Sequence, residues 1–328
     1  MKNKFLNQYG NDCRIANELD FKQTTHFALQ NAKRRNLTNS DFWKLADDAK
    51  QQLERHHEFA LKEGVLLVSQ ASDVLTGFAL IWIYPALLVY DLGDKLAGLI
   101  EDFFASDIKT ADELMNAVLE RIKIRNGCVA ALDTPASWTD RHELASRFDL
   151  LPASEYWVKT NLEQHAKNAV RQATEADFSS IVEFNAHAQK RKQESNSRFW
   201  KIHPDAPARF EAWMRHSLTL ADRSIFVAQN AQGFIVAQPT RLLPGHRTSD
   251  LIGCIDDFWS EDFGYSLEIH NDNYEIGTCL LQAAESDFYA RGARTSLVIT
   301  TSAWKSKNQL LKANGYHPAY FWSVKNLS

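Results

Sequence analysis

The sequence predicts an α/β protein (α+β in its arrangement) of two tandem domains, each a mixed, mostly antiparallel sheet flanked by helices. The main observation is an internal repeat. The pattern R-x-A-x-E-x-D-F at 14–21 recurs at 171–178, and KRRNLTNSDFWK at 33–44 is matched by KRKQESNSRFWK at 190–201. Solenoid units are only about 20–50 residues long, so this spacing indicates two whole domains. The second observation is that strand and helix patterns follow the same order in both copies.

The repeat also sets the expected boundaries. Residues 1–160 are the N-terminal domain, 161–169 the linker and 170–328 the C-terminal domain, and each domain is long enough to bury its own core. The spacing between matched residues grows along the copies, from 155 at Asp102 and Asp257 to 166 at Leu144 and Leu310. The C-terminal copy therefore carries 11 extra residues, around 266–277.

Each copy is expected to begin with a short strand at Arg14 or Arg171, followed by a helix that starts at an Asp-Phe pair. Thr174 and Asp177 have the spacing of a capping box, and the polar helix should continue beyond the shared FWK. Hairpin strands, a fourth strand, a long helix, a buried strand, a second helix and a final strand follow. In the first copy the hairpin strands are 65–70 and 77–83, the fourth strand is 99–105, the long helix 112–125, the buried strand 129–132 and the final strand 154–159. In the second copy the same elements are, in the same order, 224–229 and 233–238, 254–260, 278–292, 296–300 and 320–325.

Composition describes an ordinary soluble protein. Of the 328 residues, 45% are hydrophobic and 24% are charged, and the net charge is −4. Basic runs are short, which argues against a nucleic-acid partner. The most apolar stretch, 77–90, is too short to span a bilayer, and the first residues lack the apolar core of a signal peptide. Four isolated cysteines are typical of reduced thiols, so we expect a cytoplasmic protein with no membrane partner.

Several motifs resemble those of the GCN5-related N-acetyltransferase (GNAT) family. They are the opening R-x-A-T-x-x-D at 171–177, the helix at 277–293 and the L-x-x-x-G-Y segment at 310–318. The strand I-D-D-F-W at 255–259 and S-E-Y-W-V at 154–158 resemble a bacterial subgroup of the family. The resemblance covers nearly the whole chain in both copies. It implies a tandem GNAT protein, similar in layout to mycothiol synthase.

The resemblance implies acetyl-CoA as co-substrate, and no metal. The family pattern Q/R-x-x-G-x-G/A corresponds to 272–277, where only Gly277 is kept and Glu275 replaces the first glycine. Amides at the start of a helix would bind the pyrophosphate, and a neighbouring strand would bind pantetheine. The implied cofactor-binding residues are Ile255, Phe258, Trp259, Asn273, Tyr274, Glu275, Ile276, Gly277 and Thr278. Helix packing at Gly277 and sheet core at Phe258 and Trp259 are the alternative interpretations.

The N-terminal copy has no glycine in its matching loop, 106–115, so this domain is expected to be a degenerate copy that binds no cofactor.

For catalysis, the family often uses a carboxylate near the fourth strand as the base, which fits Asp256 and Asp257. Neighbours on a strand face opposite ways, so at most one of the two should face the substrate. The pair recurs as Glu101-Asp102 in the copy without a cofactor loop, which favours a structural role instead. The family's usual acid is a tyrosine, but the matching position is Leu311, so no acid is identified.

The first functional hypothesis is a CoA-dependent N-acyltransferase whose C-terminal domain acetylates an amine of a small molecule or peptide. The surviving helix start and the Asp pair favour it. The alternative is a non-catalytic GNAT-fold binding or regulatory protein with both sites degenerate, which the lost glycine and missing tyrosine favour. A third hypothesis, a longer acyl donor or an aminoacyl-tRNA, is weakened by the lack of a basic stripe.

Overall fold

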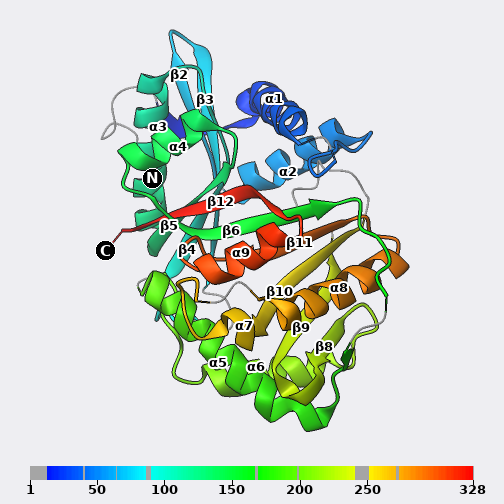
Figure 1. Ribbon diagram of the computed structural model, residues 1–328. Coiled ribbons are helices and arrows are strands. Elements are labelled where there is room, and N and C mark those ends of the chain that lie inside the picture. The colour runs from blue at the N-terminus through cyan, green and yellow to red at the C-terminus, as the bar shows by residue number, and fades with distance from the viewer. Residues whose placement is uncertain are drawn as a thin grey trace.

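The computed structural model describes residues 13–39, 41–63, 65–85, 90–166, 169–197, 199–240, 251–270 and 273–327. The two halves contain the same series of elements, except that the C-terminal half has an additional short helix, α7, after its fourth strand (Figure 1). Those of the N-terminal half are β1 (Cys13–Ile15), α1 (Phe21–Thr38), α2 (Ala49–Glu63), β2 (Leu66–Ala71), β3 (Val74–Tyr84), β4 (Leu96–Ala105), α3 (Ile108–Ile124), β5 (Gly127–Pro135), α4 (Thr139–Arg147) and β6 (Leu151–Thr160). Those of the C-terminal half are β7 (Val170–Gln172), α5 (Phe178–Ser195), α6 (Ala206–Ser217), β8 (Ser224–Ala228), β9 (Gly233–Thr240), β10 (Ile252–Ser260), α7 (Glu261–Gly264), α8 (Glu275–Ala290), β11 (Thr295–Thr300), α9 (Lys305–Ala313) and β12 (His317–Asn326).

The twelve strands found in the described ranges form one sheet, in the order β1-β2-β3-β4-β5-β12-β6-β11-β10-β9-β8-β7. Most pairs are antiparallel, while β4–β5 and β10–β11 are parallel. The predicted fold class is confirmed: each half is a mixed sheet with helices on it. The order of equivalent strands reads the same from both ends, as expected for two copies of one unit placed side by side.

The two halves exchange their last strands. Strand β12 of the C-terminal half lies between β5 and β6, where Val324 pairs with Ala131. Strand β6 of the N-terminal half lies between β12 and β11, where Val158 pairs with Leu297. Each half therefore completes the other's sheet. The boundary at 161–169 stays a prediction, and the exchange means that a cut there would separate strands that pair.

Helices cover both faces of the N-terminal part of the sheet (Figure 1). Phe27 of α1 and Leu53 of α2 pack with Phe78 on one face. Val118 and Ile122 of α3 pack with apolar side chains of β4 and β5 on the other face. None of the helices within the described ranges is long and apolar enough to cross a membrane.

The first helix of each half is shorter than predicted. We expected it to continue beyond the FWK sequence, but α1 ends at Thr38 and α5 at Ser195. The prediction was wrong because an asparagine follows each helix in extended conformation. Asn39 Oδ1 accepts a hydrogen bond from Phe42 N at 3.0 Å, and Asn196 Oδ1 accepts one from Phe199 N at 3.0 Å. These side-chain bonds replace the helical ones and turn the chain.

The aromatic residues of the FWK segments pack across the molecule. Phe42 and Trp43 of the N-terminal half belong to a core cluster with Ile252 and Cys254 of β10. In return, Phe199 packs against a cluster of β5 and β12 side chains. Together with the exchanged strands, these contacts join the two halves into one body.

Candidate functional site

The predicted carboxylates, Asp256 and Asp257, lie at a β-bulge in β10. Against β9, Ile255 pairs with Ala237 but Phe258 pairs with Ile235, so two residues stand opposite one. The bulge interrupts the alternation on which we based the expectation that only one carboxylate faces the substrate side. Burial lowers the pKa of Lys192, but Tyr90, Asp257 and Asp256 together hold it above its usual range.

The parallel strands β10 and β11 separate beyond the bulge. Their ladder ends at Ile255 and Val298, although β10 continues to Ser260. The side chain of Lys307, which comes from α9 and is fully buried, lies in the gap. Its Nζ donates to the carbonyl of Phe258 on β10 at 3.2 Å and to that of Ile299 on β11 at 3.4 Å. An ammonium group thus bridges the two strands where they no longer pair.

Charges of both signs meet at this bulge. Asn185 Nδ2 donates to Asp257 Oδ1 at 3.1 Å. Burial raises the pKa of Asp257, the negative charge of Asp256 adds to that, and Lys192 and Lys307 oppose it. Burial lowers the pKa of Lys307 to about 7, with Lys192 acting in the same direction. Strongly shifted pKa values of this kind are frequent at functional sites, although buried structural ion pairs produce them too.

The N-terminal half has the same arrangement with different residues. Arg141 of α4 donates to the carbonyl of Phe103 on β4, as Lys307 does to Phe258. Arg35 of α1 forms an ion pair with Asp133 at 3.1 Å. Asn31 Nδ2 donates to Asp102 Oδ1 at 2.7 Å, in the way that Asn185 holds Asp257.

The basic residues were not found by sequence reasoning. Arg35 and Lys192 are 157 positions apart, and Arg141 and Lys307 are 166 apart, so each pair follows the repeat. These residues could have been found in the sequence, because a basic residue occurs at the same position in both copies of the repeat.

The shared carboxylates are held firmly in the N-terminal half. Glu101 accepts a hydrogen bond from His56 Nε2 at 2.8 Å and another from Trp82 Nε1. Its pKa lies below the usual range, because these contacts outweigh the opposite effect of burial. This geometry favours a structural role for the carboxylates at the bulge. A catalytic role for Asp256 or Asp257 stays a prediction.

The start of α8, where the resemblance implies a pyrophosphate, is capped by a carboxylate of the chain itself. Asp262 Oδ2 accepts a hydrogen bond from Gly277 N at 2.9 Å. A Cβ added at Gly277 would lie 2.9 Å from Leu310 Cδ2 and 3.2 Å from Phe263 Cε1. The glycine is thus enclosed by side chains, and this close packing accounts for it.

The matching helix of the other half has the same kind of cap. Asp107, which is 155 positions before Asp262, accepts a hydrogen bond from Thr110 N at 2.8 Å at the start of α3. Sequence reasoning missed both aspartates. Their recurrence at matched positions could have identified them.

The other predicted cofactor residues divide between the core and the surface. Ile255, Phe258 and Trp259 are buried, and Trp259 stacks on Phe184 with ring centroids 4.3 Å apart. At the helix start, Tyr274 is buried, Ile276 and Thr278 are half-buried, and Asn273 and Glu275 are exposed. These residues are therefore not brought together around one hollow, and their role as a cofactor site stays a prediction.

The position that matches the family's acid and the nearest tyrosine after it are also in the core. Leu311 is completely buried, and Tyr316 donates its hydroxyl to Glu285 at 2.9 Å. Neither side chain lies free for proton transfer.

Acetyl-CoA does not fit this arrangement. The amide that a phosphate oxygen would need is bonded to Asp262, and the exposed Glu275 places a second negative charge at the same helix start. Next to it, the Phe258 carbonyl that could receive a pantetheine amide is bonded to Lys307. Among the described residues, no group of three or more His, Cys, Asp or Glu side chains could hold a metal ion.

The geometry defines the class of protein: two equivalent α/β units, each with a bulged fourth strand that separates from a parallel fifth strand. No model of a known protein family and no curated protein matches the sequence. Among solved structures, the chain is similar to a GCN5-related N-acetyltransferase from Sphaerobacter thermophilus. The identity is 15%, the TM-score is 0.58, and the match covers 96% of this chain and 95% of that one.

Two further solved structures are more distant. One is a putative acetyltransferase from Pyrococcus horikoshii, with 13% identity, a TM-score of 0.45 and coverage of 96% of this chain and 88% of that one. The other is a tandem GNAT protein from the clavulanic acid biosynthesis pathway, with 9% identity, a TM-score of 0.43 and coverage of 80% and 82%. The likeness to the Sphaerobacter thermophilus structure shows that the chain has the GCN5-related N-acetyltransferase fold, and the equivalent strand orders of the two halves show it twice in tandem. At this level of identity the likeness concerns the fold alone.

Proposed function

We propose that this chain is a GNAT-fold binding or regulatory protein in which neither half carries out acetyl-CoA-dependent transfer. The fold of its neighbours is used for acyl transfer, but function depends on the site rather than on the fold. The observation that carries the proposal is the hydrogen bond between Asp262 and the amide of Gly277. A carboxylate at this place accepts the hydrogen bond of the amide, and its negative charge repels a phosphate.

The repetition of this feature supports the proposal. Asp107 caps the equivalent helix, so both places at which the fold could bind a pyrophosphate are taken by an aspartate of the chain. Lys307 and Arg141 likewise use the equivalent backbone carbonyls in the two halves. One occupied binding group could be accidental. The same backbone groups are occupied by side chains in both halves, which supports the loss of acetyl-CoA binding in both.

Calorimetric titration of the full-length protein with acetyl-CoA tests the proposal. We expect no binding at concentrations up to about 1 mM, where Kd corresponds to about −4 kcal/mol. Asp262→Ala should be titrated beside the parent protein, because it removes the repelling charge. Micromolar affinity of the parent protein for acetyl-CoA would contradict the proposal.

A second candidate function is N-acyl transfer in the C-terminal half. Asp257 and Lys307 favour it. The pKa of Asp257 is raised and that of Lys307 is lowered, and both shifts suit proton transfer at neutral pH. In that case Asp257→Asn should lower turnover by about 100-fold or more, with acetyl-CoA affinity unchanged. Release of free CoA in the presence of a panel of amines is the measurement that separates this candidate from the first.

A further inference from the structure

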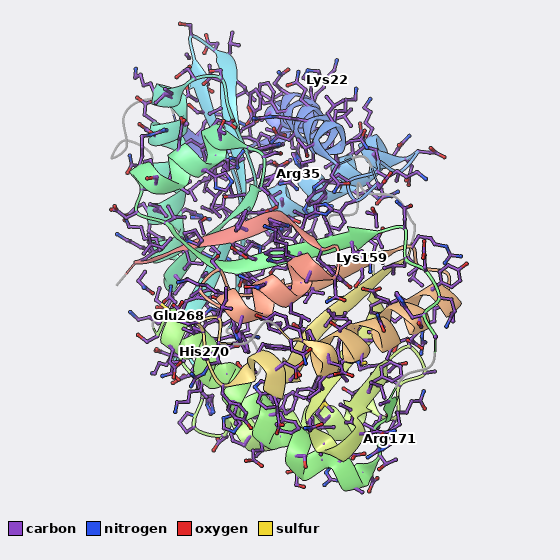
Figure 2. All side chains as sticks on the ribbon, in the orientation of Figure 1. Lys22, Arg35, Lys159, Arg171, Glu268 and His270 are labelled. Atoms are coloured by element: carbon purple, nitrogen blue, oxygen red, sulfur yellow. The ribbon has the colours of Figure 1, made fainter. Side chains whose placement is uncertain are left out.

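Glu285 of α8 is a buried carboxylate that holds the chain where it passes from one half to the other. Its side chain accepts hydrogen bonds from Lys159 Nζ at 2.8 Å, from His165 Nε2 at 2.7 Å and from the hydroxyl of Tyr316 at 2.9 Å. Lys159 belongs to β6, the strand that the N-terminal half contributes, and Figure 2 shows it close to α8. His165 lies in the linker that follows β6, so one carboxylate binds both parts of the connection.

The fold does not require a carboxylate at this place. The matched residues of the N-terminal half, 166 positions earlier, are Leu119 for Glu285 and Leu150 for Tyr316. Both leucines are buried in an apolar core cluster with other side chains of α3. Because burial of a charged group is costly unless its contacts compensate for it, the carboxylate of the C-terminal half points to a role beyond packing.

The linker segment, which we define as residues 163–166, is attached to α8 by a single residue. The ring of His165 donates to Glu285, and its amide donates to Ser286 Oγ at 3.0 Å. In the described part of the chain, the hydrogen bonds of this segment both come from His165. The other three residues of the segment are exposed.

The segment also lies over empty space. Together with α8 and β7, residues 164–166 line a cavity of about 560 Å³, whose wall on the helix includes Gln282, Ala283 and Ser286. Side chains in a packed core leave few voids larger than a water molecule. Over this cavity the segment gains little from packing, so its attachment depends on His165.

Attachment and detachment of the segment are closely balanced. Ordering the backbone of one residue costs a free energy similar to what one hydrogen bond contributes, and here two bonds order four residues. The charge of Glu285 strengthens one of them, because a bond to an ionised acceptor is about twice as strong as a neutral one. The carboxylate therefore sets how much of the time the segment is attached.

Detachment leaves no charge buried alone. Lys159 and His165 are 24% and 25% exposed, so the imidazole can turn to solvent while the ammonium stays paired with Glu285. The segment can thus leave the helix without unfolding of the core around it.

We propose that the linker segment is a lid over this cavity, which detaches from α8 and returns while both halves stay folded, and that Glu285 is the residue that holds it closed. In the detached state, Gln282, Ala283 and Ser286 lose the cover of the segment and become accessible. This inference goes beyond the proposed function and does not depend on acetyl-CoA.

Hydrogen exchange of single amides tests the inference, measured by NMR on the full-length protein in urea concentrations below the unfolding transition. We expect exchange of the His165 amide to be independent of urea, because a local opening exposes little new surface. Exchange of the amide of Leu281, which is buried in α8, should become faster as urea is added, because it requires unfolding that exposes much more surface.

Variants of Glu285 test what holds the lid. Glu285→Leu introduces the residue of the N-terminal half and should speed exchange at His165 about 10-fold or more, with the fold kept. Glu285→Gln keeps the shape and an acceptor, so it should speed exchange about 3-fold. The matched control is Lys325→Met. Lys325 lies 166 positions after Lys159 but donates to the Phe148 carbonyl, so this change should leave exchange at His165 within twofold.

Two results would overturn the inference. If exchange of the His165 amide rises with urea as it does at Leu281, the segment opens only when the protein unfolds. This urea series uses the parent protein and gives an answer even if a variant fails to fold. If neither Glu285 variant changes exchange at His165 by more than twofold, the carboxylate does not hold the lid.

Discussion

At the scale of single residues, one aspartate organises the start of each half. Asp177 accepts hydrogen bonds from Arg171 at 2.7 and 2.8 Å and from the amide of Thr174 at 2.8 Å. Asp20 makes the same contacts with Arg14 and Asn17. The side-chain bonds of Arg171, followed by those of Thr174, lower the pKa of Asp177 to about 2, although burial opposes the shift.

Asp177→Ala should therefore destabilise the protein by about 1–2 kcal/mol, the usual cost of losing a helix cap, because Arg171 is half exposed and its pairing is screened. The folded-state pKa is lowered, so the contribution of Asp177 is present above its unfolded pKa of about 3.9 and is lost as the pH falls towards 2. Chemical denaturation at pH 7 and at pH 2.5 measures this.

The control for this change is Glu175→Ala in the same turn, where the side chain is exposed and the stability should be unaffected. If both variants were equally stable at pH 7, the cap would have no energetic role.

The sequence was informative about residues whose partners lie nearby in the chain. The spacing of Thr174 and Asp177 predicted a cap that the structure confirms. It was uninformative about Lys307 and Asp262, whose partners, Phe258 and Gly277, are 49 and 15 positions away. No local pattern specifies which backbone group such a side chain will reach, because that depends on how the strands and helices pack.

At the scale of elements, the extra residues of the C-terminal half and the ends of the first helices show where the repeat and the periodicity no longer predict structure. The repeat located the extra residues of the C-terminal half, but their conformation could not be predicted because they have no counterpart in the other copy. The first helix of each half was predicted to continue beyond FWK, but Asn39 and Asn196 turn the chain before that segment. Side-chain bonds to the backbone override periodicity there.

Two tryptophans at matched positions of the repeat provide a pair of mutations. Trp138 and Trp304 are both fully buried, so replacing either by Phe removes a similar ring volume. Trp304→Phe additionally breaks the bond to the Phe263 carbonyl, whereas Trp138→Phe removes an N–H that has no partner among the described residues. Trp304→Phe should therefore cost about 1–3 kcal/mol more than Trp138→Phe in urea denaturation. A smaller cost for Trp304→Phe would show that the bond from Trp304 to the Phe263 carbonyl does not stabilise the start of α9.

At the scale of the whole molecule, the repeat predicted two similar units but not how they are joined. Both copies contain a final strand with equivalent residues, so the sequence is equally compatible with a strand that returns to its own half. The structure has each final strand in the opposite half. Only the packing of distant segments distinguishes the two, such as Phe42 and Trp43 on β10 and Phe199 on β5.

The exchange predicts that the two halves associate without a covalent link. Residues 1–166 and 169–328, expressed together as separate chains, should purify as a 1:1 complex, because β6 and β12 each lie between two strands of the opposite half. Val158→Pro in β6 should abolish assembly, since this residue pairs with Leu297 on one side and His317 on the other, and proline is excluded from central strands. Size-exclusion chromatography with light scattering gives the answer. Two independent, folded monomers would mean that each final strand can return to its own half, and that the interlocked sheet is not what holds this molecule together.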